Sequence, residues 1–527
     1  MPLIHRKSLP SLFALVFVAV AALARPGLGQ STGPQALAEP SPLRFVVTYD
    51  ESISRSFTGR VYVITTESQR REPRRGPSWF RPAPFFAVDV IDWKPNDPLI
   101  FHDDALGYPG LLSTIATGNY AVQTVMRLNP DAPTIGAAGN AYSVNARFQL
   151  DAKSSGTITL HIDQVDKAQP FPETDRIKLA QLRSDLLSEF HGRDMMMRAA
   201  IILPQDYDEK GDRRYPAYYW IGGFGSDHRI APRMRRTWDA TGYADRIVRI
   251  VLDPTCYGGH HVFADSANNG PVGQALVEEF IPYLEKTFPL TAAPTARFVS
   301  GHSSGGWASL WLQITYPDFF GGVWSLAPDP IDFRDFQRIN LYEPDMYMYV
   351  DAEGNQRPVA RRGDQVMLWY EPFAKLEVIL GEGGQLRSFE WVFSPRGPDG
   401  LPRPLYDRET GAVNHVVAQS WKRYDIHLIL QNNWSTLGPI LQGKLHIIAG
   451  ELDTFYLEGP VRALKESLQR LGSDAVIEIV PGATHGSFAT PDLRKRIDEQ
   501  LLAIFEMHHG LPATRAEPKT PATVPAY

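Results

Sequence analysis

Cysteine is almost absent from this sequence. The 527 residues contain a single cysteine, Cys256, so no disulfide can form within the chain. Stability must therefore come from packing rather than from covalent crosslinks. Cys256 could be a catalytic thiol, but it is followed by Tyr257-Gly258-Gly259 rather than set in a nucleophile motif, and we interpret it as a small, partly buried residue.

The sequence also lacks a large excess of one charge and a long apolar run. The 53 basic and 59 acidic residues do not favour nucleic acid as a partner. The apolar run at residues 12–24 is too short to be a convincing membrane span. It follows His5, Arg6 and Lys7 and precedes small residues, the three-part pattern of a signal peptide. We predict a signal peptide over residues 1–29 and a secreted or periplasmic protein with no stable membrane span after cleavage; a retained anchor is the alternative.

The first part of the remaining chain alternates with a period of two residues. Ile158, Leu160 and Ile162 alternate with polar residues, as in a strand with one buried face. No helical pattern interrupts the series, so we predict an N-terminal β-sandwich domain over residues 40–170 that folds on its own. Strands are expected at residues 43–49, 61–65, 85–91, 120–128, 141–150 and 157–165.

From about residue 191 the pattern changes to strands that alternate with helices. This alternation predicts a mostly parallel sheet covered on both faces, in an α/β region over residues 191–510. Residues 329–433 break it and are rich in Pro, Gly, Arg and aromatic residues, which indicates an insertion over the functional site. A Pro/Ala/Thr-rich tail at residues 511–527 is expected to be disordered. Strands are expected at residues 195–203, 217–222, 248–252, 297–300, 322–326, 444–449 and 476–480, and helices at 273–288, 306–316, 459–471 and 492–508.

One motif of the α/β region indicates catalysis. Gly301-His302-Ser303-Ser304-Gly305 lies between a predicted strand and a predicted helix and fits the G-x-S-x-G pattern of a nucleophile elbow. The small residues are needed because the turn forces the serine backbone into a strained conformation. The motif predicts Ser303 as a nucleophile.

A serine nucleophile needs a general base, and the base needs a carboxylate to orient it. Asp453 and His485 each follow a predicted strand, in the chain order serine, acid, histidine. We therefore predict that Ser303, Asp453 and His485 form a catalytic triad. Asp329, which also follows a predicted strand, is the alternative acid.

The reaction also needs two backbone donors for the oxyanion of the tetrahedral intermediate. We assign them to the N–H groups of Ser304 and Phe224, with Gly223 as the near alternative to Phe224. Gly223 and the side chains of a later loop are expected to line the substrate cleft, and a metal site is the alternative for the later loop. Adjacent histidines point in different directions and no second ligand cluster is evident, so we predict no metal site. The triad mechanism needs no cofactor. The predicted cleft residues are Gly223, His260, His261 and Asp265.

These motifs together resemble the putative esterase family of α/β hydrolases, which includes esterase D, feruloyl esterases, mycolyltransferases and ferric enterobactin esterases. The resemblance implies an α/β-hydrolase fold over about residues 195–508 and assigns nucleophile, acid and base to Ser303, Asp453 and His485. The family often has His-Gly in the oxyanion loop, where this chain has Gly222-Gly223. The motifs that carry the resemblance are Trp220-Ile221-Gly222-Gly223-Phe224-Gly225, residues 263–271, Gly301-His302-Ser303-Ser304-Gly305, Gly450-Glu451-Leu452-Asp453-Thr454 and Thr484-His485.

The residues and the resemblance together indicate a secreted serine esterase that hydrolyses carboxylic esters through an acyl-enzyme. Its substrate is expected to be a small-molecule or polysaccharide-linked ester. One alternative is an acyltransferase or peptidase that uses the same triad. Another is a catalytically inactive binding protein with a hydrolase fold.

Overall fold

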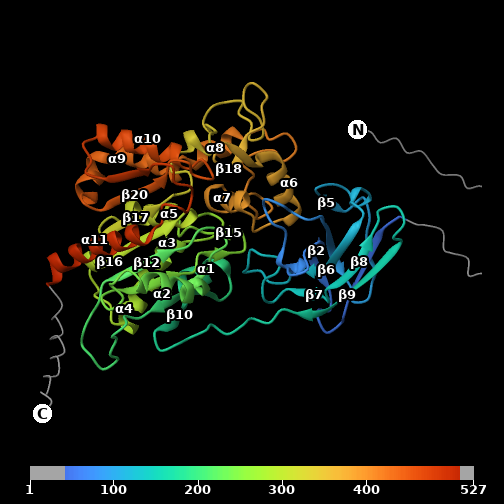
Figure 1. The fold of residues 1–527 in the computed structure, drawn as a ribbon, viewed down its shortest axis with the longest axis horizontal. Coiled ribbons are helices and arrows are strands. Elements are labelled where there is room, and N and C mark those ends of the chain that lie inside the picture. Colours follow the sequence, from blue (N-terminus) through green and yellow to red (C-terminus); the bar gives the residue numbers. More distant parts are fainter. Residues whose placement is uncertain (1–41, 511–527) are drawn as a thin grey trace, which may run out of the picture. The chain divides into compact units, whose positions relative to one another are not determined.

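An eight-stranded sheet forms the centre of the C-terminal part of the molecule (Figure 1). The computed structural model describes residues 42–510. The strands are β10 (Ile177–Ser184), β11 (Met195–Ile202), β12 (Ala217–Ile221), β13 (Val248–Leu252), β16 (Arg297–His302), β17 (Gly322–Leu326), β20 (Leu445–Gly450) and β21 (Val476–Val480). Their order is β10-β11-β13-β12-β16-β17-β20-β21. Neighbours from β13 to β21 are parallel, whereas β11 is antiparallel to β10 and β13.

Helices cover both faces of this sheet. They are α1 (Asp185–His191), α2 (Ala231–Asp239), α3 (Val272–Ala275), α4 (Ile281–Thr287), α5 (Ser304–Thr315), α10 (Glu458–Arg470) and α11 (Pro491–His509). Apolar residues of α3, α4, α5 and α10 join the core on one face, and those of α2 and α11 join the core on the other. The expected helix at residues 273–288 is α3 and α4 joined by a π-helical turn. The arrangement is the α/β-hydrolase fold that the sequence predicts.

The central strands are buried on both sides, which explains their nearly continuous apolar sequences. In β12, Tyr219 and Ile221 point into the core that contains α5, and Tyr218 points into the core that contains α11. Successive side chains of a strand point to opposite faces, so a strand covered twice needs apolar residues on both faces. A buried polar residue such as Ser300 has a partner, the carbonyl oxygen of Trp324 (2.6 Å).

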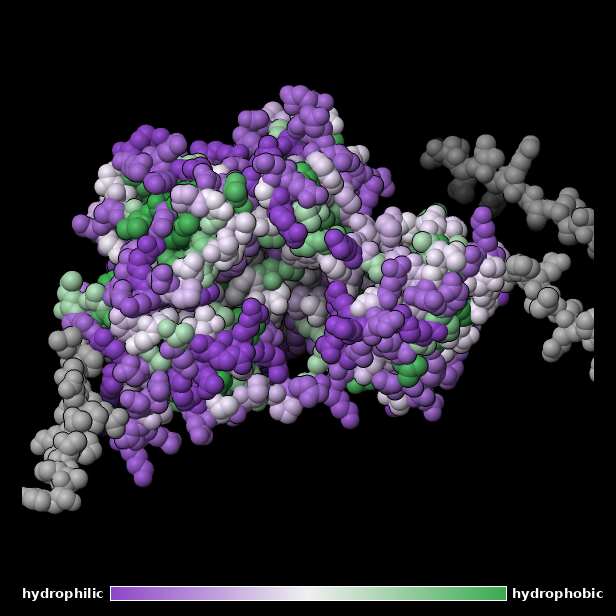
Figure 2. Space-filling view, in the orientation of Figure 1, coloured by the Kyte–Doolittle hydropathy of each residue, from purple (hydrophilic) through white to green (hydrophobic). Residues whose placement is uncertain are grey.

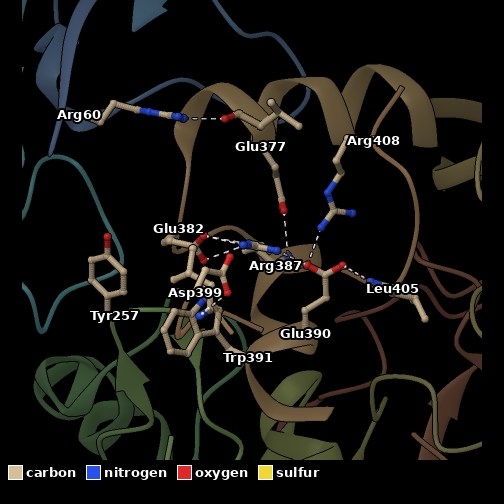
Figure 3. A network of polar contacts seen from close by, with 12 residues as sticks. Arg60, Tyr257, Glu377, Glu382, Arg387, Glu390, Trp391, Asp399, Leu405 and Arg408 are labelled. Atoms are coloured by element: carbon tan, nitrogen blue, oxygen red, sulfur yellow. Dashed lines mark hydrogen bonds and ion pairs between the residues drawn. The ribbon is translucent and has the colours of Figure 1, made fainter. Parts of the chain in front are cut away.

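The insertion has secondary structure of its own. It contains β18 (Pro358–Arg362), β19 (Gln365–Trp369), α6 (Tyr370–Leu380), α7 (Gln385–Phe393), α8 (His415–Ser420) and the beginning of α9 (Ile426–Leu441). The Glu390 side chain is almost completely buried, and its carboxylate accepts hydrogen bonds from Arg387 (2.7 Å) and Arg408 (2.5 Å) (Figure 3). Arg387 also pairs with Glu382 at 2.8 Å. Removing one partner would leave the other charge buried without a counter-charge, so these residues depend on one another.

The N-terminal residues 42–165, which we call the β region, form a nine-stranded mixed sheet. Its path is β4-β1-β9-β7-β6-β2-β3-β5, with β8 paired to β6. All pairs are antiparallel except β1 with β9. Hydrogen bonds join all of these strands into one sheet and do not divide them into two packed sheets. The β-sandwich therefore stays a prediction. The strands are β1 (Arg44–Tyr49), β2 (Phe57–Thr66), β3 (Phe85–Trp93), β4 (Leu99–Phe101), β5 (Leu106–Tyr108), β6 (Gly118–Met126), β7 (Ala141–Ser143), β8 (Ala146–Leu150) and β9 (Thr157–Val165).

The β region has its own apolar core, but a second apolar face of β2, β3 and β6 packs on the insertion. Leu376 and Ile379 of α6 belong to this second cluster. Arg60 donates to the carbonyl oxygen of Ile379 (3.0 Å), and the Tyr62 hydroxyl donates to that of Leu380 (2.6 Å). These carbonyls lie in the last turn of α6, where they have no partner within the helix. The β region thus caps and covers a helix of the insertion, and its folding as an independent domain stays a prediction.

The described residues all belong to one compact unit. Among them, no helix is long and apolar enough to cross a membrane. The predicted signal peptide at residues 1–29 and the predicted disordered tail at 511–527 lie outside the described residues.

Candidate active site

Ser303 lies on the sharp turn between β16 and α5. Its backbone has φ of 60° and ψ of −121°, a conformation that residues with a side chain rarely adopt. A Cβ on Gly301 would lie 2.0 Å from the carbonyl oxygen of Gly305, and one on Gly305 would lie 2.0 Å from that of Ile221. The turn therefore needs both glycines, and its geometry is that of a nucleophile elbow.

Asp453 and His485 are brought together from the loops after β20 and β21. Nδ1 of His485 and Oδ2 of Asp453 are 2.8 Å apart. The Asp453 side chain is fully buried, whereas that of His485 is 14% exposed. An ionised carboxylate only accepts hydrogen bonds, so Nδ1 carries the proton and Nε2 of His485 keeps its lone pair. This is the tautomer that a general base requires.

Asp329 also lies beside the serine, three residues after β17. Its carboxylate accepts hydrogen bonds from the hydroxyls of Ser303 (3.2 Å) and Ser304 (2.5 Å). Among the described residues, no hydrogen bond joins Ser303 to His485, so the serine hydroxyl is directed toward Asp329. Burial raises the pKa of Asp329. Of the two candidate acids, Asp453 contacts the histidine and Asp329 contacts the serines.

The glycine-rich loop after β12 lies directly against the elbow. A Cβ on Gly223 would be 3.1 Å from Cβ of Ser303, so this position tolerates no larger residue without movement. Nε2 of His260 donates to the carbonyl oxygen of Gly222 (2.9 Å), while its Nδ1 accepts from the amide of Val262 (3.0 Å). His260 therefore holds in place the loop that contains the predicted oxyanion donor Phe224.

The second predicted donor is Ser304, the first residue of α5. The first N–H groups of a helix lack partners within the helix and carry the positive end of its dipole. The Ser304 amide is therefore suited to hold a negatively charged oxygen beside Ser303.

Residues 191–396 match the model of a protein family described as "Putative esterase". Because of this match, we call the α/β region, insertion included, the esterase domain. The matched residues of this esterase domain include the oxyanion loop and the elbow and end before Asp453 and His485. No curated protein matches the chain in sequence.

Several solved structures are similar to part of this chain. A ferulic acid esterase has 12% identity and a TM-score of 0.40, with 63% of this chain and 99% of that chain covered. The serine hydrolase FphF of Staphylococcus aureus has 15% identity and a TM-score of 0.37, with 62% and 98% covered. An S-formylglutathione hydrolase of Agrobacterium tumefaciens has 13% identity and a TM-score of 0.38, with 62% and 95% covered.

Two residues of the insertion reach the site of the esterase domain although no sequence motif marks them. Nε2 of Gln385, the first residue of α7, is 3.4 Å from both Oγ of Ser304 and Oδ2 of Asp329. Nε of Arg361, on β18, donates to the carbonyl oxygen of Asp453 at 3.0 Å. The expected insertion over the active site therefore supplies contacts on both the serine side and the acid side.

The remaining predicted cleft residues bind backbone groups. Nδ1 of His261 accepts from the amide of Phe263 (3.1 Å), and burial lowers the pKa of His261 to about 3. The Asp265 carboxylate accepts from the amide of Gly273 (2.7 Å) at the beginning of α3.

Two alternatives from the sequence concern a reactive thiol and a metal site. Burial raises the pKa of Cys256 to about 12, which fits a structural residue rather than a reactive thiol. The described residues contain no cluster that could hold a metal ion.

A cavity of about 1040 Å³ lies between the β region and the esterase domain, and Figure 2 shows the molecule hollowed between them. Arg60 and Arg127 line it from one side, and His261 and Trp391 line it from the other. Ser303 is not among its lining residues. His261 therefore faces this cavity, and its contact with a bound ester stays a prediction.

Proposed function

We propose that the chain is a serine esterase that hydrolyses carboxylic esters through Ser303, His485 and Asp453. The observation that carries the proposal is the 2.8 Å contact between Nδ1 of His485 and the buried Asp453 carboxylate. The backbone carbonyl oxygen of His485 lies 2.7 Å from Nε2 of His302, the residue before the serine in the elbow. Such a contact fixes the imidazole tautomer and stabilises the imidazolium that forms when the histidine takes the serine proton.

In the proposed reaction, Oγ of Ser303 first turns from Asp329 toward Nε2 of His485. Ser303 then gives its proton to His485 and attacks the ester carbonyl carbon, while the amides of Ser304 and Phe224 bind the oxyanion. The proton passes to the departing alcohol as its C–O bond breaks, leaving an acyl-enzyme. A water molecule, deprotonated by His485, releases the acid and restores Ser303.

We further propose that the enzyme acts outside the cytoplasm on a small-molecule or polysaccharide-linked ester. The support for export is the signal-peptide pattern over residues 1–29. Expression of the full chain with fractionation of the host, followed by N-terminal sequencing, tests this proposal. A mature N-terminus near residue 30 in the exported fraction is expected, and an uncleaved chain in the membrane fraction would contradict it.

Labelling with a fluorophosphonate probe tests the catalytic proposal. The wild-type protein should be labelled on Ser303 and should hydrolyse a p-nitrophenyl ester. The Ser303→Ala variant should unfold at the wild-type temperature, lose the label and lose about 10⁴-fold or more of kcat, because members of a triad act as a unit. Wild-type hydrolysis in the folded variant would refute the proposal.

The same assay separates the alternatives. A labelled enzyme that transfers the acyl group to an added alcohol faster than to water would be an acyltransferase. A folded wild-type protein that takes no label would be an inactive binding protein.

A further inference from the structure

Trp79 belongs to the β region by sequence but packs on the core of the esterase domain. It lies in the loop between residues 76 and 84, ahead of β3. Its ring centroid is 5.6 Å from that of Phe224, in the oxyanion loop, and 5.1 Å from that of Phe373, on α6. This half-buried indole therefore connects the β region, the insertion and the oxyanion loop at one place.

The Phe224 ring has a second neighbour on the hairpin of β14 (Thr255–Cys256) and β15 (Gly259–His260). A Cβ on Gly259 would lie 3.0 Å from the Phe224 ring and 2.6 Å from Cβ of Ser388, so only glycine fits there. The next residue, His260, holds the carbonyl oxygen of Gly222. The hairpin thus supports the loop from one side, and Trp79 packs on the same ring.

The loop that contains Trp79 follows a segment that is held in place by the buried side chain of Arg74. Arg74 is buried, and its guanidinium pairs with Asp166 (2.7 Å) and Glu72 (2.8 Å) and lies 4.2 Å from the centre of the Tyr142 ring. A buried arginine with two carboxylates and an aromatic face holds its backbone in one place. The prolines at positions 77, 82 and 84 further restrict the loop. Trp79 is therefore presented by a restrained segment.

We propose that Trp79 is a positioning residue for the oxyanion loop, so that the β region helps to aim the Phe224 amide at the developing oxyanion. The inference rests on the proposed function. Trp79 acts through the Phe224 ring and makes no contact with the reacting atoms. Removing an oxyanion donor costs roughly 10²- to 10³-fold in kcat, and a displaced donor costs part of that.

Three variants test this inference. Trp79→Ala removes the ring, Trp79→Phe restores an aromatic ring, and Phe80→Ala changes the next residue, which is 42% exposed. On a p-nitrophenyl ester, Trp79→Ala should lower kcat by about 10- to 100-fold with KM changed less than about threefold. Trp79→Phe should recover most of kcat, and Phe80→Ala should match the wild type. Should the alanine variant fail to fold, Trp79→Leu provides the same comparison.

Amide hydrogen exchange of residues 222–226 provides a readout that does not depend on catalysis. Faster exchange in Trp79→Ala than in Phe80→Ala is expected. If exchange and kcat both stay at the wild-type level in a folded Trp79→Ala protein, the inference is wrong. If the wild type shows no hydrolysis that depends on Ser303, the proposed function fails, while faster exchange in Trp79→Ala would still support the positioning role.

Discussion

Two aspartates lie in the candidate site and contact different partners. Asp453 binds Nδ1 of His485, whereas Asp329 accepts from the hydroxyls of Ser303 and Ser304. In the proposed reaction the first contact orients the base, whereas the second directs the serine hydroxyl toward Asp329. The two carboxylates should therefore respond differently to the same substitution.

Asp453→Asn should lower kcat by about 10⁴-fold, because an amide facing Nδ1 favours the wrong histidine tautomer. Asp329→Asn should cost at most about tenfold, since the serine hydroxyl must leave Asp329 before it reacts. The kcat values of both variants on one aryl ester check this, together with thermal unfolding. A larger loss in Asp329→Asn would assign the acid to the strand β17.

Substitution of His260 tests whether its hydrogen bond to Gly222 holds the oxyanion loop in place. It donates to Gly222, and burial lowers its pKa to about 4, so the ring is neutral near pH 7. His260→Ala should lower kcat by about tenfold, because the oxyanion loop loses a fixed contact. His261→Ala is the matched control, since it removes an adjacent buried imidazole that binds Phe263 instead. Similar kcat losses in both variants would mean that the loss of a buried imidazole, and not of the contact with Gly222, lowers kcat.

At the scale of single elements, the beginning of α7 combines a functional contact with a buried acid. Gln385, its first residue, reaches Ser304 and Asp329. The Glu377 carboxylate, from α6, accepts from the amides of Leu386 and Arg387 at 3.1 Å each, which supplies partners for the free N–H groups of α7. Burial nonetheless raises the pKa of Glu377 to about 7.

This raised pKa predicts a pH dependence of stability. The folded protein keeps the Glu377 proton up to about pH 7, whereas the unfolded chain releases it near its ordinary value of 4.5. The free energy of unfolding should therefore fall as the pH rises between these values, by about 3 kcal/mol from this group. Glu377→Gln stays neutral and should reduce the difference in melting temperature between pH 5 and pH 8.

The control for this comparison is Glu371→Gln, on the more exposed side of the same helix, where Glu371 pairs with Lys375. This variant should keep the wild-type difference between the two pH values. An unchanged difference in Glu377→Gln would show that the buried carboxyl does not set the pH dependence.

At the scale of the whole molecule, the β region and the esterase domain share surfaces. Leu376 and Ile379 of α6 pack on the β region, and Trp79 packs on the esterase domain. Removing the β region would expose Leu376 and Ile379 to water and would remove Trp79 from the Phe224 ring. The two parts should therefore depend on each other for both stability and catalysis.

A chain that begins at residue 169 tests this dependence, because it keeps Phe171 stacked on His228 at 5.5 Å. We expect kcat/KM on a small aryl ester to fall by at least about tenfold and the melting temperature to fall, since apolar area of α6 becomes exposed. Full-length Trp79→Ala serves as the comparison that separates the two effects. A truncated chain with wild-type kcat/KM and melting temperature would contradict the prediction.

The sequence by itself determined the parts of this protein that depend on the order of residues within a short segment. Strands buried on both faces are mostly apolar, so β12, β16 and β20 could be found from their sequences. The elbow could be found because the turn at Ser303 tolerates only glycine at positions 301 and 305. Asp453 and His485 could be proposed because parallel strands end at the same edge of the sheet.

Only the tertiary structure decided which groups meet across long separations in the chain. Both Asp453 and Asp329 follow strands, and the packing of the loops determines that Asp453 contacts His485. Gln385 and Trp79 approach the site from an insertion and from the β region, and neither carries a local pattern, because their positions depend on contacts with distant residues. For the same reason no pattern in the sequence indicates that a second apolar face of the β region is covered by α6.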